Sequence, residues 1–363
     1  MPDGSARRTP VVAAIERVER LFAAQRAAFL AQPYPTAAER LARLKALKRQ
    51  TQRYQDLLAE AMSADFGFRP AAESKMLDLL GSVLEANHAV SHLKRWMKPS
   101  KRSTELLFLG NSVKVLYQPK GVVGVIVPWN FPIYLAMGPL VTALAAGNRV
   151  MIKMSEVTPA TNAVFKTLLG EVFGEDLVAV VGEELVDPNV FTSLPFDHIV
   201  FTGSPAVGKI VMRTAAHNLT PVTLELGGKS PAMVTRNYPV ADAALRITHG
   251  KSVNCGQICI APDYALVPRG RSATFAAAVA QAFTRLYPTV DGNAQYTSII
   301  TEWHAARLRD LLTDAQAKGA TLLRCGADAG NGRQMPLTVV THVDDGMRLM
   351  QEEIFGPILP VLE

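Results

Sequence analysis

Cys259 is the residue with the clearest capacity for covalent chemistry. It lies in Asn254-Cys-Gly-Gln-Ile-Cys-Ile-Ala-Pro262, a stretch of small and polar residues between an expected helix and an expected strand. A cysteine thiolate is a strong nucleophile, whereas an inert buried thiol more often lies inside a periodic apolar run. A lone cysteine is still most often a small core residue, so both interpretations stay open for Cys259 alone. No second Cys or His pair stands at ligand spacing from Cys255 and Cys259, and we expect no metal site.

Two polar residues follow expected buried strands. Glu225, in Leu224-Glu-Leu-Gly-Gly-Lys229, precedes a glycine pair, and a strand-end carboxylate that faces a cleft can act as a general base. Asn130, in Pro128-Trp-Asn-Phe-Pro132, carries an amide that can donate to an oxyanion. The alternatives are a surface salt bridge for Glu225 and an Asx turn for Asn130.

The stretch Phe201-Thr-Gly-Ser-Pro-Ala-Val-Gly-Lys209 follows an expected strand and opens an expected helix. The N–H groups and the dipole at a helix N-terminus attract anions, so this stretch is a candidate phosphate site. Gly203, Gly208 and Lys209 match the first part of a Walker A motif, but Ile210 stands where the motif needs Ser or Thr to hold magnesium. The P-loop interpretation is therefore weakened, and glycines that serve only a tight turn remain an alternative.

The elements around these residues predict a parallel α/β sheet. After a turn at 119–121, apolar stretches typical of strands buried on both faces alternate with helical patterns. The expected strands are 122–127, 149–153 and 198–202, and the expected helices are 134–146, 160–173 and 205–216.

Further elements precede and follow this sheet. A helical pattern runs from Val11 to about Lys98, with a capping box at Thr36 and Glu39, and predicts a helical N-terminal layer. The alternation over 112–117 predicts a hairpin or arm within about 104–120. A second α/β unit has expected helices at 240–252, 272–286 and 302–318 and expected strands at 264–268 and 320–323. We place the boundary near Thr223, which gives domains 1–223 and 224–363.

The composition is that of an ordinary globular protein. The chain has 363 residues, 48% of them hydrophobic and 19% charged, so it can form large cores and is not disordered as a whole. No run of about 18 apolar residues and no apolar N-terminal signal is visible, so we expect neither a membrane span nor export. The net charge of +6 is mild, and only Trp96 sits among the basic residues of 94–102, so we expect no nucleic-acid partner. Three cysteines fit a reducing compartment, and we expect a cytoplasmic protein.

Six segments together resemble the NAD(P)-dependent aldehyde dehydrogenase superfamily. They occur in the family's order: PWNFP at 128–132, KMSE at 153–156, FTGSPAVGK at 201–209, LELGGK at 224–229, GQIC at 256–259 and EEIFGP at 352–357. The helical N-terminus and NCGQICIAPDY at 254–264 look most like the class-three branch, and within it like coniferyl aldehyde dehydrogenases. The resemblance implies an α/β fold: a Rossmann-like parallel-sheet cofactor domain with a helical N-terminal layer, and a second α/β catalytic domain. Because family members continue past the point that corresponds to Glu363, we expect this catalytic domain to be incomplete at its C-terminus.

The resemblance also implies a reaction, the oxidation of an aldehyde to the carboxylic acid through a cysteine thiohemiacetal and thioester. Cys259 would attack the aldehyde. The side chain of Asn130 and the backbone amide of Cys259 would hold the oxyanion while hydride passes to the nicotinamide. Glu225 would then activate the water that releases the carboxylate.

The cofactor implied by the resemblance is NAD, with NADP as the alternative. Eight residues match the family's cofactor-binding positions: Trp129, Lys153, Glu156, Gly203, Ser204, Val207, Glu353 and Phe355. Lys153 and Glu156 would bind the adenosine ribose, the loop at 203–204 the pyrophosphate, and the pair at 353 and 355 the nicotinamide end. A carboxylate on a ribose hydroxyl repels a 2′-phosphate, so Glu156 favours NAD.

Phe131, Leu135 and Gly138 are candidate substrate-pocket residues. They fall at i, i+4 and i+7 of a helix expected directly after Asn130, so they would share one face. Core packing is the alternative, but a glycine inside a helix costs roughly 1 kcal/mol relative to alanine and leaves space instead of filling it. We expect a pocket wide enough for a planar aromatic aldehyde, with Phe131 available to stack on the ring.

Three other functions are weighed against aldehyde oxidation. Acyl transfer from the same thioester is disfavoured by the base Glu225, and a P-loop NTPase by Ile210. A non-catalytic nucleotide-binding or structural protein would follow if the catalytic domain were not functional. The arm offers an exposed strand edge, which invites pairing, and we expect a homodimer of the full-length protein.

Overall fold

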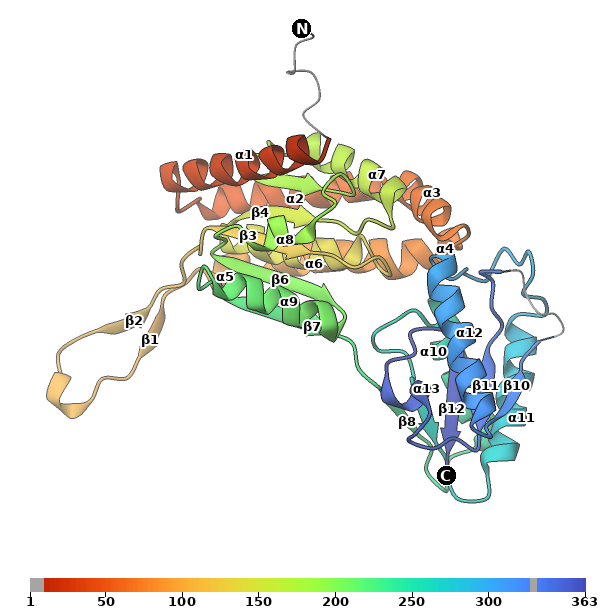
Figure 1. Cartoon of the computed structure of the whole chain (residues 1–363). Coiled ribbons are helices and arrows are strands. Elements are labelled where there is room, and N and C mark those ends of the chain that lie inside the picture. The colour runs from red at the N-terminus through yellow and green to blue at the C-terminus, as the bar shows by residue number, and fades with distance from the viewer. Residues whose placement is uncertain (1–9, 327–331) are drawn as a thin grey trace, which may run out of the picture. The chain divides into compact units, whose positions relative to one another are not determined.

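The computed structural model describes residues 10–326 and 332–363, which form two compact units (Figure 1). The first unit consists of the residues up to Leu58 and of 75–225, and the second of 59–74 and 226–363. Within the described residues, no helix has both the length and the apolar character needed to cross a membrane.

Helices open the first unit, as the N-terminal pattern predicts. Their bounds are α1 (Pro10–Ala31), α2 (Ala37–Arg53), α3 (Gln55–Phe66), which continues into the second unit, the π-helix η1 (Lys75–Leu80) and α5 (Gly81–Trp96). The capping box is confirmed at the start of α2: the Thr36 side chain accepts from the Glu39 N–H, and the Glu39 carboxylate accepts from the Thr36 N–H. Leu44 and Leu47 of α2 are fully buried.

A five-stranded sheet forms the centre of the first unit. Its strands are β3 (Val122–Ile126), β4 (Arg149–Lys153), β5 (Val178–Val181), β6 (His198–Gly203) and β7 (Val222–Leu226), in the order β5-β4-β3-β6-β7. The pairs β3/β4, β3/β6 and β4/β5 are parallel. The connecting helices are α6 (Tyr134–Ala146), α7 (Pro159–Gly170), α8 (Pro188–Thr192) and α9 (Pro205–Ala216).

The strands of this sheet are buried because helices cover them. Every residue of β4 and β5 is buried, which explains their nearly continuous apolar sequence. Val18, Leu21 and Phe22 of α1 join Met151 and Ile199 in one apolar cluster, and α6 also contacts β3 and β4. The predicted parallel α/β sheet is confirmed.

The arm leaves the first unit as a two-stranded hairpin (Figure 1). Strand β1 (Ser100–Arg102) pairs antiparallel with β2 (Val113–Val115), and a short 3-10 helix, η2 (Leu106–Phe108), lies between them. Leu106 and Leu107 at the tip are 83% and 86% exposed. The predicted hairpin is confirmed, with a strand shorter than the 112–117 expected.

The second unit contains another five-stranded sheet. Its strands are β8 (Pro231–Met233), β9 (Tyr264–Leu266), β10 (Thr321–Arg324), β11 (Thr338–Thr341) and β12 (Ile358–Leu362), in the order β10-β11-β12-β9-β8. All pairs are parallel except β10/β11. The helices are α4 (Ala71–Ser74), α10 (Val240–Ser252), the 3-10 helix η3 (Val253–Gly256), α11 (Ser272–Leu286), α12 (Glu302–Ala317) and α13 (Arg348–Gln351).

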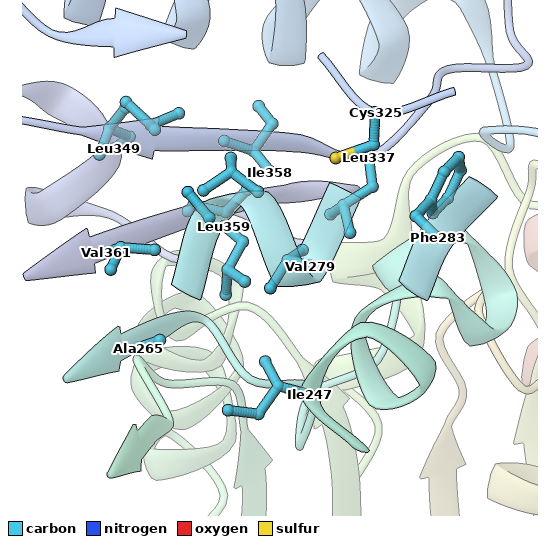
Figure 2. Packing of buried hydrophobic residues seen from close by; sticks show 14 of the residues in the cluster. Ile247, Ala265, Val279, Phe283, Cys325, Leu337, Leu349, Ile358, Leu359 and Val361 are labelled. Atoms are coloured by element: carbon cyan, nitrogen blue, oxygen red, sulfur yellow. The ribbon is translucent and has the colours of Figure 1, made fainter. Parts of the chain in front are cut away.

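The core of this unit lies between the sheet and its helices. Figure 2 shows Val279 of α11 beside Leu359 of β12, and Phe283 of α11 on the side of Leu337 and Cys325. Ile247 of α10 belongs to the same cluster, so helices from separate parts of the chain close over one sheet.

Residues 59–74 pack with the second unit, although the predicted boundary assigned them to the N-terminal domain. The reason is a set of hydrogen bonds to the later chain. The Ser298 N–H donates to the Phe68 carbonyl (3.0 Å), and the Arg333 guanidinium donates to the Phe66 carbonyl. The Glu73 carboxylate accepts from the Asn254 N–H (3.0 Å).

Candidate active site

The first unit gathers predicted residues at the carboxyl ends of its strands. Ile126 pairs with both Lys153 and Phe201, so β3, β4 and β6 end side by side. The chain runs outward from β3 to β4 and β5 and then returns to β6 on the other side of β3. An open α/β sheet binds ligands at such a change of direction, beyond the carboxyl ends of the strands. The loops that begin at Val127 and Ser204 both leave the sheet there.

Asn130 lies in the loop after β3 and is buried, whereas the neighbouring Trp129 is half-buried. The Asp78 carboxylate, fully buried in η1, anchors the end of this loop: its Oδ1 accepts from the N–H groups of Ile133 (3.1 Å) and Tyr134 (2.9 Å). These N–H groups stand at the start of α6 and have no partner within the helix. A buried acid from η1 therefore fixes the backbone that follows Asn130.

The helix expected at 134–146 is confirmed as α6, but the expectation that it starts directly after Asn130 and includes Phe131 is wrong, because α6 begins at Tyr134. Phe131 lies in the preceding turn, where its carbonyl accepts from the Leu135 N–H (3.0 Å), and its side chain is buried. Leu135 and Gly138 do lie on α6 and are half-buried. A Cβ at Gly138 would meet no atom within 4 Å, so this glycine borders open space.

Lys153 and Glu156 lie at and after the end of β4. Lys153 is buried and its Nζ donates to the Met154 carbonyl (2.7 Å). Burial lowers the pKa of Lys153, while the carboxylates of Glu156, Glu184 and Glu183 oppose that shift. Glu156 is exposed, so its carboxylate is available to a ligand.

The loop after β6 leads into α9 through an N-cap. The Ser204 side chain accepts from the Val207 N–H (3.4 Å), Pro205 occupies the first turn, and Ser204 and Val207 are both exposed. A Cβ at Gly203 would come within 2.6 Å of the Phe201 ring, so a larger residue there would displace that ring. An exposed backbone at the start of a 12-residue helix suits the phosphates of a dinucleotide. Glu225, at the end of β7, is exposed.

In the second unit, Cys259 follows a strained segment of backbone. Asn254, Cys255 and Gly256 have φ values of 48°, 53° and 72°. Left-handed backbone costs a non-glycine residue roughly 1–2 kcal/mol, so other contacts must stabilise this turn. A Cβ at Gly256 would lie 2.5 Å from the carbonyl oxygen of Gly356, which explains the need for glycine there.

Buried side chains hold this turn. The Glu73 carboxylate accepts from the Asn254 N–H (3.0 Å) and from the Thr297 hydroxyl (2.7 Å). Gln257 donates to the carbonyls of Asn254 (2.9 Å) and Ser298 (3.1 Å), and its side-chain oxygen accepts from the Ile300 N–H (2.9 Å). The turn that precedes Cys259 is thus held by hydrogen bonds to two distant parts of the chain, around Glu73 and around Ser298.

The two neighbouring cysteines have opposite environments. Cys255 is fully buried beside the Tyr296 hydroxyl (3.4 Å), and burial raises its thiol pKa to about 12. Such a thiol is protonated and unreactive at neutral pH. Cys259 is half-buried and follows the fastened turn. All three cysteines are thiols, and no group of three or more His, Cys, Asp or Glu within the described ranges could hold a metal ion.

Glu353 and Phe355 lie in the loop between α13 and β12. The Glu353 carboxylate lies against the backbone of Gly227, where a Cβ would come within 2.0 Å of its oxygen, and burial raises its pKa. Phe355 is half-buried and has a φ of 54°. The loop meets the Cys259 segment where Gly356 touches Gly256.

The residues that support these segments could not be identified from their types and spacing in the sequence. Asp78, Glu73, Gln257 and Asp263 are buried or partly buried polar groups with long-range hydrogen bonds. The sequence does carry a signal for Asp263, since it is an acid placed directly before the apolar strand at 264–266.

The family model described as the aldehyde dehydrogenase family matches residues 8–363. A probable coniferyl aldehyde dehydrogenase of Pseudomonas aeruginosa is 52% identical over 348 residues, which are 96% of this chain and 73% of that protein. A coniferyl aldehyde dehydrogenase of a Pseudomonas species is 44% identical over 84% of this chain and 64% of its own length.

Solved structures agree. The substrate-bound Staphylococcus aureus AldH is 34% identical with a TM-score of 0.88, over 95% of this chain and 75% of that one. A Mycobacterium tuberculosis aldehyde dehydrogenase in complex with NAD+ is 32% identical with a TM-score of 0.85. The match covers 96% of this chain and 73% of that one.

The chain belongs to the aldehyde dehydrogenase family. It is an oxidoreductase that acts on aldehydes, and the resemblance stated from the six segments is confirmed. The comparisons give no support to the non-catalytic alternative.

Proposed function

We propose that the chain oxidises an aromatic aldehyde of the coniferyl type to its carboxylic acid, with Cys259 as the nucleophile. The observation that carries this assignment is the contrast between the half-buried Cys259 and the fully buried Cys255, whose pKa burial raises to about 12. A nucleophile must reach substrate and reach the thiolate form, and Cys255 can do neither.

The reaction proceeds in two stages. The Cys259 thiolate adds to the aldehyde carbon and forms a thiohemiacetal, whose oxyanion accepts from the Asn130 amide and the Cys259 N–H. A bound NAD+ would supply the acceptor for the hydride that leaves this carbon, and a thioester on Cys259 would remain. Glu225 then takes a proton from water, which attacks the thioester and releases the carboxylate and the Cys259 thiolate.

The cofactor is NAD+, with NADP+ as the alternative. Its pyrophosphate would bind at the start of α9, at Gly203, Ser204 and Val207, and Trp129 of the loop after β3 would be a further cofactor-binding residue. Lys153 and Glu156 would hold the adenosine ribose, and the exposed carboxylate of Glu156 favours NAD+ over NADP+. Glu353 and Phe355 would contact the nicotinamide end.

An aromatic substrate is supported by two observations. Gly138 borders open space on α6 next to Leu135, and two relatives at 44–52% identity carry the name coniferyl aldehyde dehydrogenase. Phe131 is only 8% exposed, so its contribution to the pocket is packing more than stacking on the substrate ring.

We also propose that the arm pairs with a second copy of the chain and that the protein is cytoplasmic. The apolar tip of the arm, at 106–109, is exposed and would be covered in a homodimer. Three reduced thiols fit a reducing compartment.

The test is NADH formation with coniferyl aldehyde, cinnamaldehyde and acetaldehyde. We expect higher kcat/KM for the two aromatic aldehydes. In Glu225→Gln, a burst of NADH followed by a slow steady state is expected, because the base acts only after the thioester forms. Loss of the burst itself would contradict this role of Glu225. Equal efficiency on all three aldehydes would contradict the aromatic substrate class.

A further inference from the structure

The loop that carries Glu353 is held by charged side chains instead of by regular secondary structure. Arg307 of α12 donates to the carbonyls of Glu353 (2.6 Å) and Ile354 (2.9 Å). Lys229 donates to the carbonyls of Leu349 (2.8 Å) and Glu352 (3.1 Å), at the end of α13. Without these donors the carbonyls would lose their partners in a partly buried loop.

Asp263 connects this loop to the cysteine segment. It lies four residues after Cys259 and is 3% exposed. Its Oδ1 accepts from the Ile354 N–H (3.0 Å), directly after Glu353, and its Oδ2 accepts from the Lys229 ammonium. The Asp263 N–H donates to the Ser230 carbonyl (2.8 Å), so Asp263 joins the segments that contain Lys229, Cys259 and Glu353.

A buried ion pair is expensive to break, because the partner left behind is a desolvated charge. Asp263 and Lys229 therefore hold each other's side chains in place. Because Asp263 also accepts from the Ile354 N–H, the pair restricts the backbone next to Glu353. The Glu353 side chain remains half-buried, with its carboxylate on the backbone of Gly227. Its backbone is held by Arg307 and, next to it, by Asp263.

We propose that Asp263, together with Lys229 and Arg307, is a positioning residue that sets the place of Glu353 for the nicotinamide end of the cofactor. This inference rests on the proposed role of Glu353 in cofactor binding. It adds that Asp263 acts on cofactor affinity through Glu353 and has no contact of its own with the cofactor.

The test is equilibrium binding of NADH, followed by nicotinamide fluorescence, in Asp263→Asn, Glu353→Gln and the double variant. A displaced contact can cost on the order of a hundredfold, and we expect each single variant to raise the Kd for NADH by roughly ten- to a hundredfold. Because Asp263 acts through Glu353, the double variant should bind no more weakly than Glu353→Gln alone. Asp242→Asn, which removes an exposed ion pair with Arg246 in the same unit, is the matched control and should bind as the unchanged protein does.

Three results would overturn the inference. One is an unchanged Kd in Asp263→Asn, and another is a double variant in which the two effects multiply. The third is an unchanged Kd in Glu353→Gln. That result would contradict the proposed role of Glu353 itself, whereas the first two would contradict only the role of Asp263. If Asp263→Asn does not fold, Arg307→Lys serves instead. It keeps the charge and loses the paired donors, and it should weaken NADH binding in the same direction.

Discussion

The two units hold their functional residues in different ways. In the first, Lys153 and the loops that begin at Val127 and Ser204 stand where parallel strands in register come to an end. In the second, Cys259 and Glu353 lie on irregular backbone, which is held by hydrogen bonds to side chains that include Glu73, Gln257 and Asp263. Topology alone is enough to align strand ends, whereas an irregular loop needs a partner for each polar group of its backbone.

The difference has an energetic side. Asn254 and Cys255 occupy left-handed backbone, at roughly 1–2 kcal/mol each, and the hydrogen bonds of Glu73 and Gln257 offset that strain. The ends of β3, β4 and β6 need no left-handed backbone, and a glycine at 203 is explained by the nearby Phe201 ring and not by its φ. Substitutions of the residues that hold the turn in the second unit, such as Glu73 and Gln257, should therefore disturb the backbone around Cys259. Substitutions at the strand ends of the first unit should disturb their backbone less.

The largest expected effect separates the two cysteines. Cys259→Ser should lower kcat to background, a loss on the order of 10⁴-fold or more, because the covalent path is removed. Cys255→Ser should keep turnover, since that thiol is buried and protonated, although it can lower stability. Steady-state NADH formation checks both. Turnover that survives in Cys259→Ser and is lost in Cys255→Ser would reverse the assignment.

The second largest loss of kcat is expected for a substitution of Asn130 in the first unit. Asn130→Ala should lower kcat by about a hundred- to a thousandfold if its amide stabilises the oxyanion. Asn111→Ala, in the exposed arm, is the control and should leave kcat unchanged. A loss of only a few-fold in Asn130→Ala would assign Asn130 to the turn before α6 instead of to the chemistry.

The strained turn can be tested with two glycines of the second unit. Gly256→Ala should destabilise the protein by about 1–2 kcal/mol from its φ of 72° and by roughly 1–3 kcal/mol more from contact with the Gly356 backbone. Gly270→Ala has a similar φ of 79° and open space, so it should show the first contribution alone. Urea unfolding followed by circular dichroism measures both. Equal losses would show that the close approach of Gly356 contributes nothing.

The smallest expected effect concerns substrate size at the first unit. Gly138→Trp should fill the open space on α6 and lower kcat/KM for cinnamaldehyde by roughly tenfold or more relative to acetaldehyde. Equal losses on both aldehydes would mean that Gly138 serves only helix packing.

Much of the fold could be predicted from the sequence because its strands are buried on both faces. Continuous apolar runs such as 122–127 and 149–153 identify the parallel sheet, and helical periodicity identifies α6, α9 and α11 within a few residues. The short elements β8, α8 and α13 carry too few residues for any period to show. The bounds of α6 were predicted correctly, but Phe131 was wrongly placed on this helix, because Asp78, more than 50 positions earlier, supplies the acceptor at its N-terminus.

The candidate site was predictable only in part, because long-range hydrogen bonds decide how its residues are placed. The types of Cys259, Asn130 and Glu225 suggest chemistry, but local sequence does not tell a buried thiol from a reactive one. The distinction between Cys255 and Cys259 depends on a left-handed turn held by Glu73 and by Gln257. The packing of 59–74 with the second unit is likewise a matter of long-range hydrogen bonds.

The most direct test of the central claim is to find the acyl group. Glu225→Gln, mixed with NAD+ and cinnamaldehyde and quenched with acid during the burst, is digested and analysed by mass spectrometry. The proposed mechanism predicts a cinnamoyl adduct on the peptide that contains Cys259, in an amount that matches the NADH of the burst. NADH formed without any adduct, or an adduct on another residue, would contradict it.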